Sequence, residues 1–139
     1  MPEILKKIQN PNFRLTNKTF NFPSVIRDHF YTANYFVKSA KIIRDHLPET
    51  VITMQFFQRN DNVMVAGVDE AIALLQTFAN NPHDLDVEAV RDGDVVNAKE
   101  PVLKIMGRYK DFGFLESLID GILARRTNVA TNTRDVLVA

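Results

Sequence analysis

The sequence contains no cysteine among its 139 residues. This absence excludes a disulfide framework, a thiol nucleophile and a zinc site with thiolate ligands. Glycine is scarce, with five residues in all, and no glycine-rich phosphate loop is present. No apolar run approaches the roughly 20 residues that span a bilayer, and the N-terminus lacks the apolar stretch of a signal peptide. We therefore expect a cytoplasmic protein with no membrane partner.

An excess of charge of either sign is also missing. The 17 basic residues balance the 17 acidic ones, so nothing favours nucleic acid as a partner. The three histidines, His29, His46 and His83, lie far apart in the sequence, and neither an HExxH motif nor a nucleophile elbow occurs. An apolar content of 45%, with ten phenylalanines, suffices for a packed core. We expect a single domain without catalytic residues, a metal site or a bound cofactor of its own.

Apolar periodicity predicts a long helix over 24–47, with Ser24 as its N-cap and Pro48 just beyond its end. Its predicted buried face consists of Ile26, Phe30, Ala33, Val37, Ala40 and Leu47. Tyr35 is oriented roughly 160° away from the Ala33–Val37 face, at about 100° per residue. Its ring therefore packs either on a second layer of the same domain or on a partner outside this core.

Shorter patterns follow the helix. Strands are predicted over 50–57, 63–67 and 85–90, and a helix over 69–79. After a turn at 91–94, the residues over 94–107 predict two strands forming a hairpin, and a helix runs from 112 to about 126. This order favours an α+β fold, with helices packed on a mixed, mostly antiparallel sheet and the hairpin as a small barrel-like lobe.

The two ends of the chain differ from the middle. Residues 1–23 predict an N-terminal arm whose Phe13, Phe20 and Phe22 pack onto the domain formed by 24–139. The tail over 127–139 ends on apolar residues without glycine or proline, which indicates a truncated chain. The alternative is a C-terminal helix or strand that docks fully onto the domain.

Several segments together resemble one known family. They are FYTANYF at 30–36, VITMQFFQR at 51–59, DGDVV at 92–96, EPVLKIMG at 100–107, FGFLE at 112–116 and RTNVATN at 126–132. In this order they are similar to the N-terminal domain of nicotinate phosphoribosyltransferases, which are type II phosphoribosyltransferases related to the quinolinate enzymes. The resemblance runs from about residue 28 to 134.

The resemblance implies an enzyme of NAD biosynthesis that joins nicotinate to phosphoribosyl pyrophosphate and releases pyrophosphate. It implies a homo-oligomer whose catalytic residues, with Mg²⁺ and ATP, belong to a barrel domain missing here, so this chain alone is expected to be inactive. Four residues are implied to bind substrate. Tyr35 corresponds to a tyrosine that stacks on the pyridine ring from the neighbouring subunit, and Arg59 to an arginine near the phosphates of the partner's site. Arg126 and Thr127 open the matching segment at 126–132, and an arginine fork suits a phosphate or carboxylate.

The sequence differs from its relatives at two positions, and other interpretations of the same residues exist. Ser117 stands where quinolinate enzymes carry an arginine for the second carboxylate, which favours a monocarboxylate such as nicotinate. Ala33 replaces an aspartate common in relatives. Arginines at 125 and 126 also suit a helix C-terminus through its dipole. A stand-alone binding or dimerisation module with this fold is the alternative function. A lipoyl-type carrier is disfavoured by the residues flanking Lys99.

Overall fold

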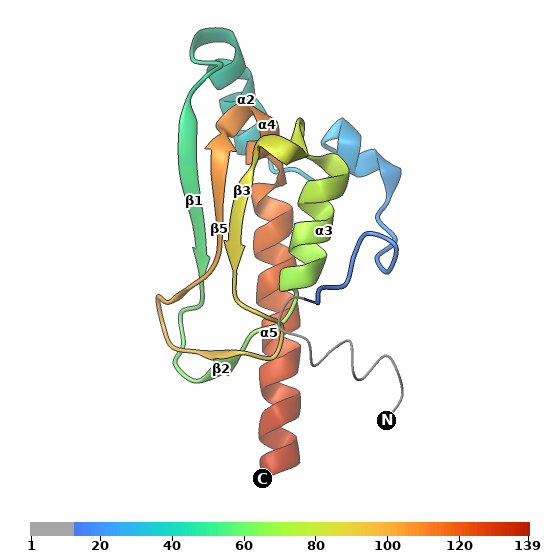
Figure 1. The fold of residues 1–139 in the computed structure, drawn as a ribbon, viewed down its shortest axis with the longest axis vertical. Helices are drawn as coiled ribbons and strands as arrows, with labels where there is room; N and C mark the ends of the chain where they lie inside the picture. Colours follow the sequence, from blue (N-terminus) through green and yellow to red (C-terminus); the bar gives the residue numbers. More distant parts are fainter. Residues whose placement is uncertain (1–12) are drawn as a thin grey trace.

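The computed structural model describes residues 13–139, and the part of the expected arm over 1–12 lies outside the described residues. Figure 1 shows a sheet along one side and a long C-terminal helix that begins below α4 and extends past the lower end of the sheet. The helices and strands are η1 (Ser24–Asp28), α2 (Asn34–His46), β1 (Val51–Phe57), β2 (Val63–Met64), α3 (Val68–Phe78), η2 (Pro82–Asp84), β3 (Asp86–Ala89), β4 (Val95–Val96), β5 (Pro101–Arg108), α4 (Tyr109–Phe112), η3 (Gly113–Leu115) and α5 (Glu116–Val138).

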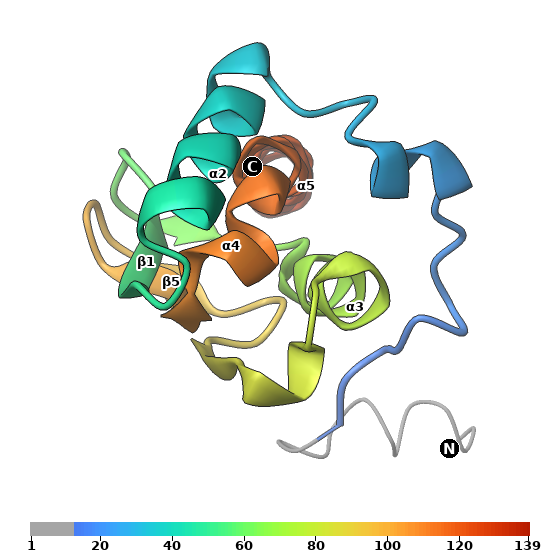
Figure 2. The same ribbon diagram turned by 90° about the horizontal axis from the view of Figure 1, so that it is seen from above.

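Two antiparallel sheets form the β-structure. The larger has the strand order β1-β5-β3, with β5 in the centre, and the smaller pairs β2 with β4. Figure 2 shows α5 between α2 and α3 on one side of the larger sheet. The predicted α+β fold of helices on a mostly antiparallel sheet is therefore confirmed.

The core lies between the larger sheet and the helices α3 and α5. It is built from apolar side chains that the alternation of β5 and the apolar face of α3 point inward. Its largest fully buried members are Phe112, Leu74, Leu75, Leu103, Ile105, Leu115, Ile119, Val65, Val68 and Val102. This core fixes α5 against the sheet and thereby places the polar side chains of α5 described below.

The predicted helix over 24–47 is wrong in its first half. A short 3₁₀ turn, η1, ends at Asp28 and is followed by His29, whose φ of 62° lies in the left-handed region, and α2 begins only at Asn34. The His29 ring stacks on Phe114 at 4.5 Å between centroids, and the Thr32 hydroxyl donates to the Phe114 carbonyl at 2.9 Å. These tertiary contacts hold the chain in a non-helical path despite its helical periodicity.

The predicted buried face of this segment is also largely wrong. Ile26 is buried, but Phe30 and Leu47 are 71% and 58% exposed, and α2 has no fully buried residue. The expectation that Tyr35 points away from the core is confirmed, since its side chain is 72% exposed. The helix α2 is therefore a surface element that turns aromatic side chains outward.

The hairpin predicted over 94–107 is not formed. β4 pairs with β2, whereas β5 pairs with β1 and β3, so the two segments belong to different sheets. A turn at 97–100, with Lys99 at a φ of 67°, carries the chain from one sheet to the other. Short strands choose partners through long-range packing, which adjacency in the sequence does not reveal.

The last helix begins later and runs further than predicted. α5 extends through the whole predicted tail to Val138. Its final turns do not dock, because Val136, Leu137 and Val138 are 75%, 79% and 77% exposed. The alternative of a C-terminal helix is thus right about the helix and wrong about its burial.

Candidate functional site

The end of β1 carries Arg59 out of the sheet toward α5. The register between β1 and β5 shifts between Phe56 and Phe57, where the partner strand begins with Pro101, a residue without an N–H to donate. The next carbonyl, of Gln58, accepts the Lys99 amide from the crossing turn at 2.8 Å. The ladder therefore stops here, and Arg59 leaves the strand as an exposed side chain.

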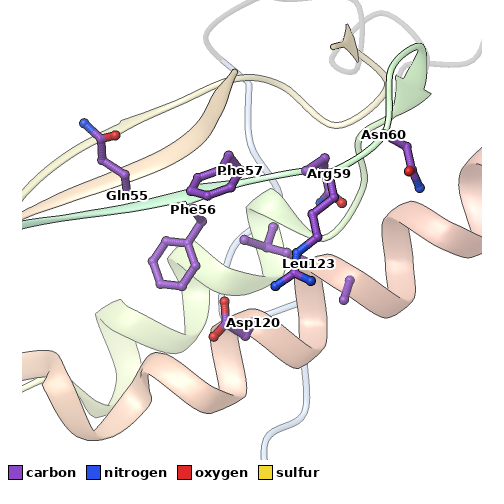
Figure 3. Close-up of a pocket in the computed structure, with 9 residues that line it drawn as sticks. Gln55, Phe56, Phe57, Arg59, Asn60, Asp120 and Leu123 are labelled. Carbon is purple, nitrogen blue, oxygen red and sulfur yellow. The ribbon is translucent and has the colours of Figure 1, made fainter. Parts of the chain in front are cut away.

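A groove separates this strand end from α5. It has a volume of about 470 Å³ and is lined by Gln55, Phe56, Phe57, Gln58, Arg59, Asn60, Asp120, Leu123 and Ala124. Figure 3 shows the Arg59 side chain pointing from the strand end toward α5, where Asp120 and Leu123 form the opposite wall. Within residues 13–139, Arg59 makes no hydrogen bond or ion pair, so its guanidinium is available to an anion.

The acidic side of the groove is partly desolvated. Burial raises the pKa of the Asp120 carboxyl above its ordinary value. Burial, and after it the charge of Asp120, raises the pKa of Glu116, which lies one helical turn earlier on α5. The negative charges of Asp120, which lines the groove, and of Glu116 beside it are therefore costly to maintain in the free domain. From the sequence, Glu116 was included only as the last residue of the FGFLE segment and Asp120 was not singled out, although their i, i+4 spacing on a predicted helix was a visible signal.

Tyr35 lies apart from Arg59, on α2. Its ring meets Phe36 edge-on at 5.3 Å and is otherwise turned to solvent. Tyr109, at the start of α4, is near enough for Tyr35 to contribute to its raised pKa, after burial and Glu116. Tyr35, Tyr109 and Glu116 thus lie in one neighbourhood where α2 approaches the start of α5.

Arg126 is held by an ion pair. Its Nε donates to Glu70 Oε2 at 2.8 Å and its Nη2 to Glu70 Oε1 at 3.5 Å, which joins α5 to the first turn of α3. On an α-helix Arg126 points about 120° away from Asp120, so it lies on a different face of α5 from the Arg59 groove. The structure therefore does not bring Arg59 and Arg126 into one site within this chain.

Thr127 is buried, with an exposed fraction of 3%. Its hydroxyl accepts the Ala66 amide at 3.2 Å and donates to the Ala66 carbonyl at 3.2 Å. Gln58 Nε2 also donates to this hydroxyl at 3.5 Å. Thr127 thus already has partners within the chain, and its predicted contact with substrate stays a prediction.

A second groove continues from the first along the C-terminal half of α5. The two share Gln58, Asn60 and Ala124, and the second has a volume of about 460 Å³. Its lining is mostly polar, with Asn62, Asn128 and Asn132 among its residues. Arg134, which also lines it, donates to the Asn62 carbonyl at 2.7 Å and pairs with Asp135.

The described residues offer neither a metal-binding cluster nor a membrane-spanning helix. Within 13–139, no three His, Cys, Asp or Glu side chains are grouped so that they could hold a metal ion. Over the same range, no helix is long and apolar enough to cross a membrane.

Comparison with known proteins identifies the domain. Residues 30–127 match the family described as quinolinate phosphoribosyl transferase, N-terminal domain. The chain belongs to this family. It is the N-terminal domain of a type II phosphoribosyltransferase. The matched residues include Tyr35, Arg59, the groove beside Asp120 and the ion pair of Arg126.

A solved structure has the same fold. The quinolinate phosphoribosyltransferase-type domain is similar to the crystal structure of nicotinate-nucleotide pyrophosphorylase from Pyrococcus furiosus, with a TM-score of 0.60 and 23% sequence identity. The similarity covers 75% of this chain and 27% of that one, so the chain spans about a quarter of the length of the protein it matches. It confirms an α+β fold with helices on antiparallel sheets.

Proposed function

We propose that this domain, formed by 24–139 behind an arm over 1–23, is the N-terminal domain of a nicotinate phosphoribosyltransferase. Such an enzyme joins nicotinate to phosphoribosyl pyrophosphate and gives nicotinate mononucleotide and pyrophosphate. The observation that carries the proposal is the exposure of Tyr35. An aromatic ring that is 72% exposed on α2, and that contacts only Phe36 among the rings of the described chain, suits a role outside its own domain.

The proposed substrate contacts involve residues of two subunits. Tyr35 stacks on the pyridine ring bound by the neighbouring subunit, and Arg59 contacts the phosphates of the same substrates through its unpaired guanidinium. Arg126, with Thr127 beside it, adds a second cation for a phosphate. The catalytic groups, Mg²⁺ and ATP belong to the catalytic domain. The N-terminal domain alone transfers no phosphoribose, because the transfer needs positioned charge around the pyrophosphate.

The preferred base is nicotinate and not quinolinate. Quinolinate carries a second carboxylate, which requires a paired cation when it is bound in a desolvated site. Ser117, on the first turn of α5, supplies no such charge, and its hydroxyl is 3.5 Å from the Ala33 amide that donates to it. A site that lacks this cation leaves the second carboxylate unpaired and rejects quinolinate.

The test compares the two bases in a polypeptide in which this domain is joined to a type II catalytic domain. We expect nicotinate mononucleotide from nicotinate and phosphoribosyl pyrophosphate, and at least a tenfold lower kcat/KM with quinolinate. A higher kcat/KM with quinolinate would reverse the substrate assignment. Product formed by the 139-residue chain alone would refute the two-domain mechanism.

A second function is favoured by one observation. The exposed apolar side chains at the end of α5, Val136, Leu137 and Val138, suit a stand-alone dimerisation module with the same fold and no catalysis. In that case the domain would serve only to form dimers. Tyr35→Ala would then leave phosphoribosyl transfer by the joined polypeptide as fast as in wild type.

A further inference from the structure

The head group of Arg126 is held from one side only. Glu70 accepts from Nε and Nη2, in the side-on arrangement of an arginine–carboxylate pair. A guanidinium has five N–H groups, so this pair leaves three of them, on Nη1 and Nη2, without an acceptor within residues 13–139. The Arg126 side chain is 55% exposed, whereas Glu70 is only 16% exposed. The free edge of the guanidinium therefore faces solvent while its back lies on a largely buried carboxylate.

The stem of Arg126 is held as well. Gly67 precedes α3 with a φ of 94°, and a Cβ at this position would lie 3.0 Å from both Cβ and Cγ of Arg126. The same Cβ would lie 3.0 Å from the Ile122 carbonyl. The glycine therefore permits a close approach of α3 to α5, and the backbone of Gly67 blocks the arginine stem on that side. Arg126 is constrained at its stem and at its head.

The neighbouring arginines lack this arrangement. Arg59 and Arg125 make no hydrogen bond or ion pair within the part of the chain that the structure describes. A free arginine loses the freedom of several rotatable bonds when it binds an anion, and this loss weakens binding. Arg126 has lost much of that freedom before any ligand arrives.

We propose that Glu70 is a positioning residue that orients Arg126 so that the free Nη1–Nη2 edge binds a phosphate group of the substrate or of pyrophosphate. The proposal rests on the proposed function, which assigns a phosphate contact to Arg126. Glu70 does not itself touch the ligand. It acts by pre-organising the fork that suits two phosphate oxygens.

A competing role for Glu70 has the opposite sign. If the carboxylate only competed with phosphate for Arg126, its removal would strengthen anion binding, since it also removes a negative charge. If Glu70 orients the arginine, its removal weakens binding in spite of that charge change. A purely structural pair would lower the stability of the domain and leave the affinity for phosphate unchanged. The sign of the affinity change therefore separates the three roles.

The experiment is a titration of the ¹⁵N-labelled chain with inorganic pyrophosphate at constant ionic strength. Binding is followed by NMR at the backbone amide signals of α5, which every variant retains, and also at the Arg126 Nε–Hε signal in the chains that keep this arginine. We expect Glu70→Ala to weaken pyrophosphate binding by about three- to tenfold, the cost of ordering one long side chain. The affinity of Glu70→Gln for pyrophosphate should lie between those of the wild-type chain and Glu70→Ala, because glutamine retains one acceptor for Arg126. Glu88→Ala removes the same charge from an exposed residue of β3 and should leave binding unchanged or slightly tighter.

Three results would count against the proposal, each in a different way. Equal or tighter binding by both Glu70→Ala and Glu70→Gln would overturn the positioning role. If instead Arg126→Ala bound pyrophosphate as tightly as the wild-type chain, the phosphate contact assigned to Arg126 under the proposed function would fail. If Glu70→Ala did not fold, as judged by circular dichroism, Glu70→Gln alone would decide, because wild-type affinity in that variant would also overturn the proposal.

Discussion

The hydroxyl of Thr127 on α5 forms two hydrogen bonds with the backbone of Ala66, one to its amide and one to its carbonyl. One turn later, Thr131 does the same with Met64, at 3.0 Å to the amide and 3.4 Å to the carbonyl. Two threonines four residues apart on a helix thus pair with alternate residues of an extended segment, as a neighbouring strand would. This pairing attaches β2 and the turn before α3 to the last helix.

Replacement of Thr127 by Val should destabilise the domain. Valine matches the shape of threonine but leaves the partly buried amide and carbonyl of Ala66 without this partner, which costs about 1–3 kcal/mol of unfolding free energy. Urea denaturation followed by circular dichroism measures this loss. Thr127→Ser retains the hydroxyl, so its unfolding free energy should fall by less. A Thr127→Val variant as stable as wild type would show that these hydrogen bonds contribute nothing to stability.

Asp92 in the DGD motif caps α3 from a distance in sequence. Its carboxylate accepts the amides of Val68 at 2.8 Å and Asp69 at 3.2 Å, at the start of the helix. Asp92→Ala should therefore lower the unfolding free energy by about 0.5–2 kcal/mol. Asp92→Asn, which keeps one acceptor, should be closer to wild type in the same denaturation experiment. Equal stability of all three chains would contradict a capping role.

The sequence predicted local structure better than pairing. The strands of the larger sheet and the helix α3 were located to within about two residues, because alternation and apolar faces are local signals. The start of α2 was missed, since the contacts of His29 and Thr32 with Phe114 override a helical pattern. The false hairpin has a similar cause, because the partners of β4 and β5 are set by long-range packing.

The same division holds for the candidate site. The outward orientation of Tyr35 followed from helical spacing alone. The ion pair of Arg126 joins residues 56 positions apart, and the hydrogen bonds of Thr127 to Ala66 join residues 61 apart. No local pattern indicates such partners, so the sequence identified these residues without showing how they are held.

The raised pKa of Glu116 makes stability depend on pH. Burial and the charge of Asp120 raise the pKa above its ordinary value of 4.5, so the folded chain holds this proton more tightly than the unfolded chain. Stability contributed by this group is therefore present at low pH and is lost as pH rises from about 4.5 through the folded-state pKa. Glu116→Gln should raise the Tm at pH 7 relative to wild type, and the difference should shrink at pH 4.

The matched control is Glu88→Gln on the exposed strand β3, which should leave the pH dependence of Tm as in wild type. Thermal unfolding of the three chains between pH 4 and pH 8 makes the comparison. A Glu116→Gln variant with a lower Tm at pH 7 would show that the charged carboxylate stabilises the fold.

The exposed end of α5 should cause self-association. Val129, Val136, Leu137 and Val138 are all more than half exposed. Burial contributes about 25 cal/mol per Å² of apolar surface, so a few hundred Å² favours a dimer or larger assembly. Sedimentation velocity at micromolar concentration should show this assembly. Leu137→Lys should shift it toward monomer, whereas Asn128→Lys, on a polar part of the same helix, should not; a wild-type monomer at all concentrations would refute the prediction.

The central claim is that this domain supplies Tyr35 to a catalytic site of the neighbouring subunit. The most direct measurement mixes two inactive variants of the joined polypeptide, one with Tyr35→Ala and one with a disabled catalytic domain, and follows the formation of nicotinate mononucleotide. If the claim is correct, mixed dimers contain one site with an intact catalytic domain and a wild-type tyrosine from its partner, so the mixture regains activity that neither variant has alone. If subunits exchange and the mixture stays as inactive as its components, Tyr35 does not act across the interface.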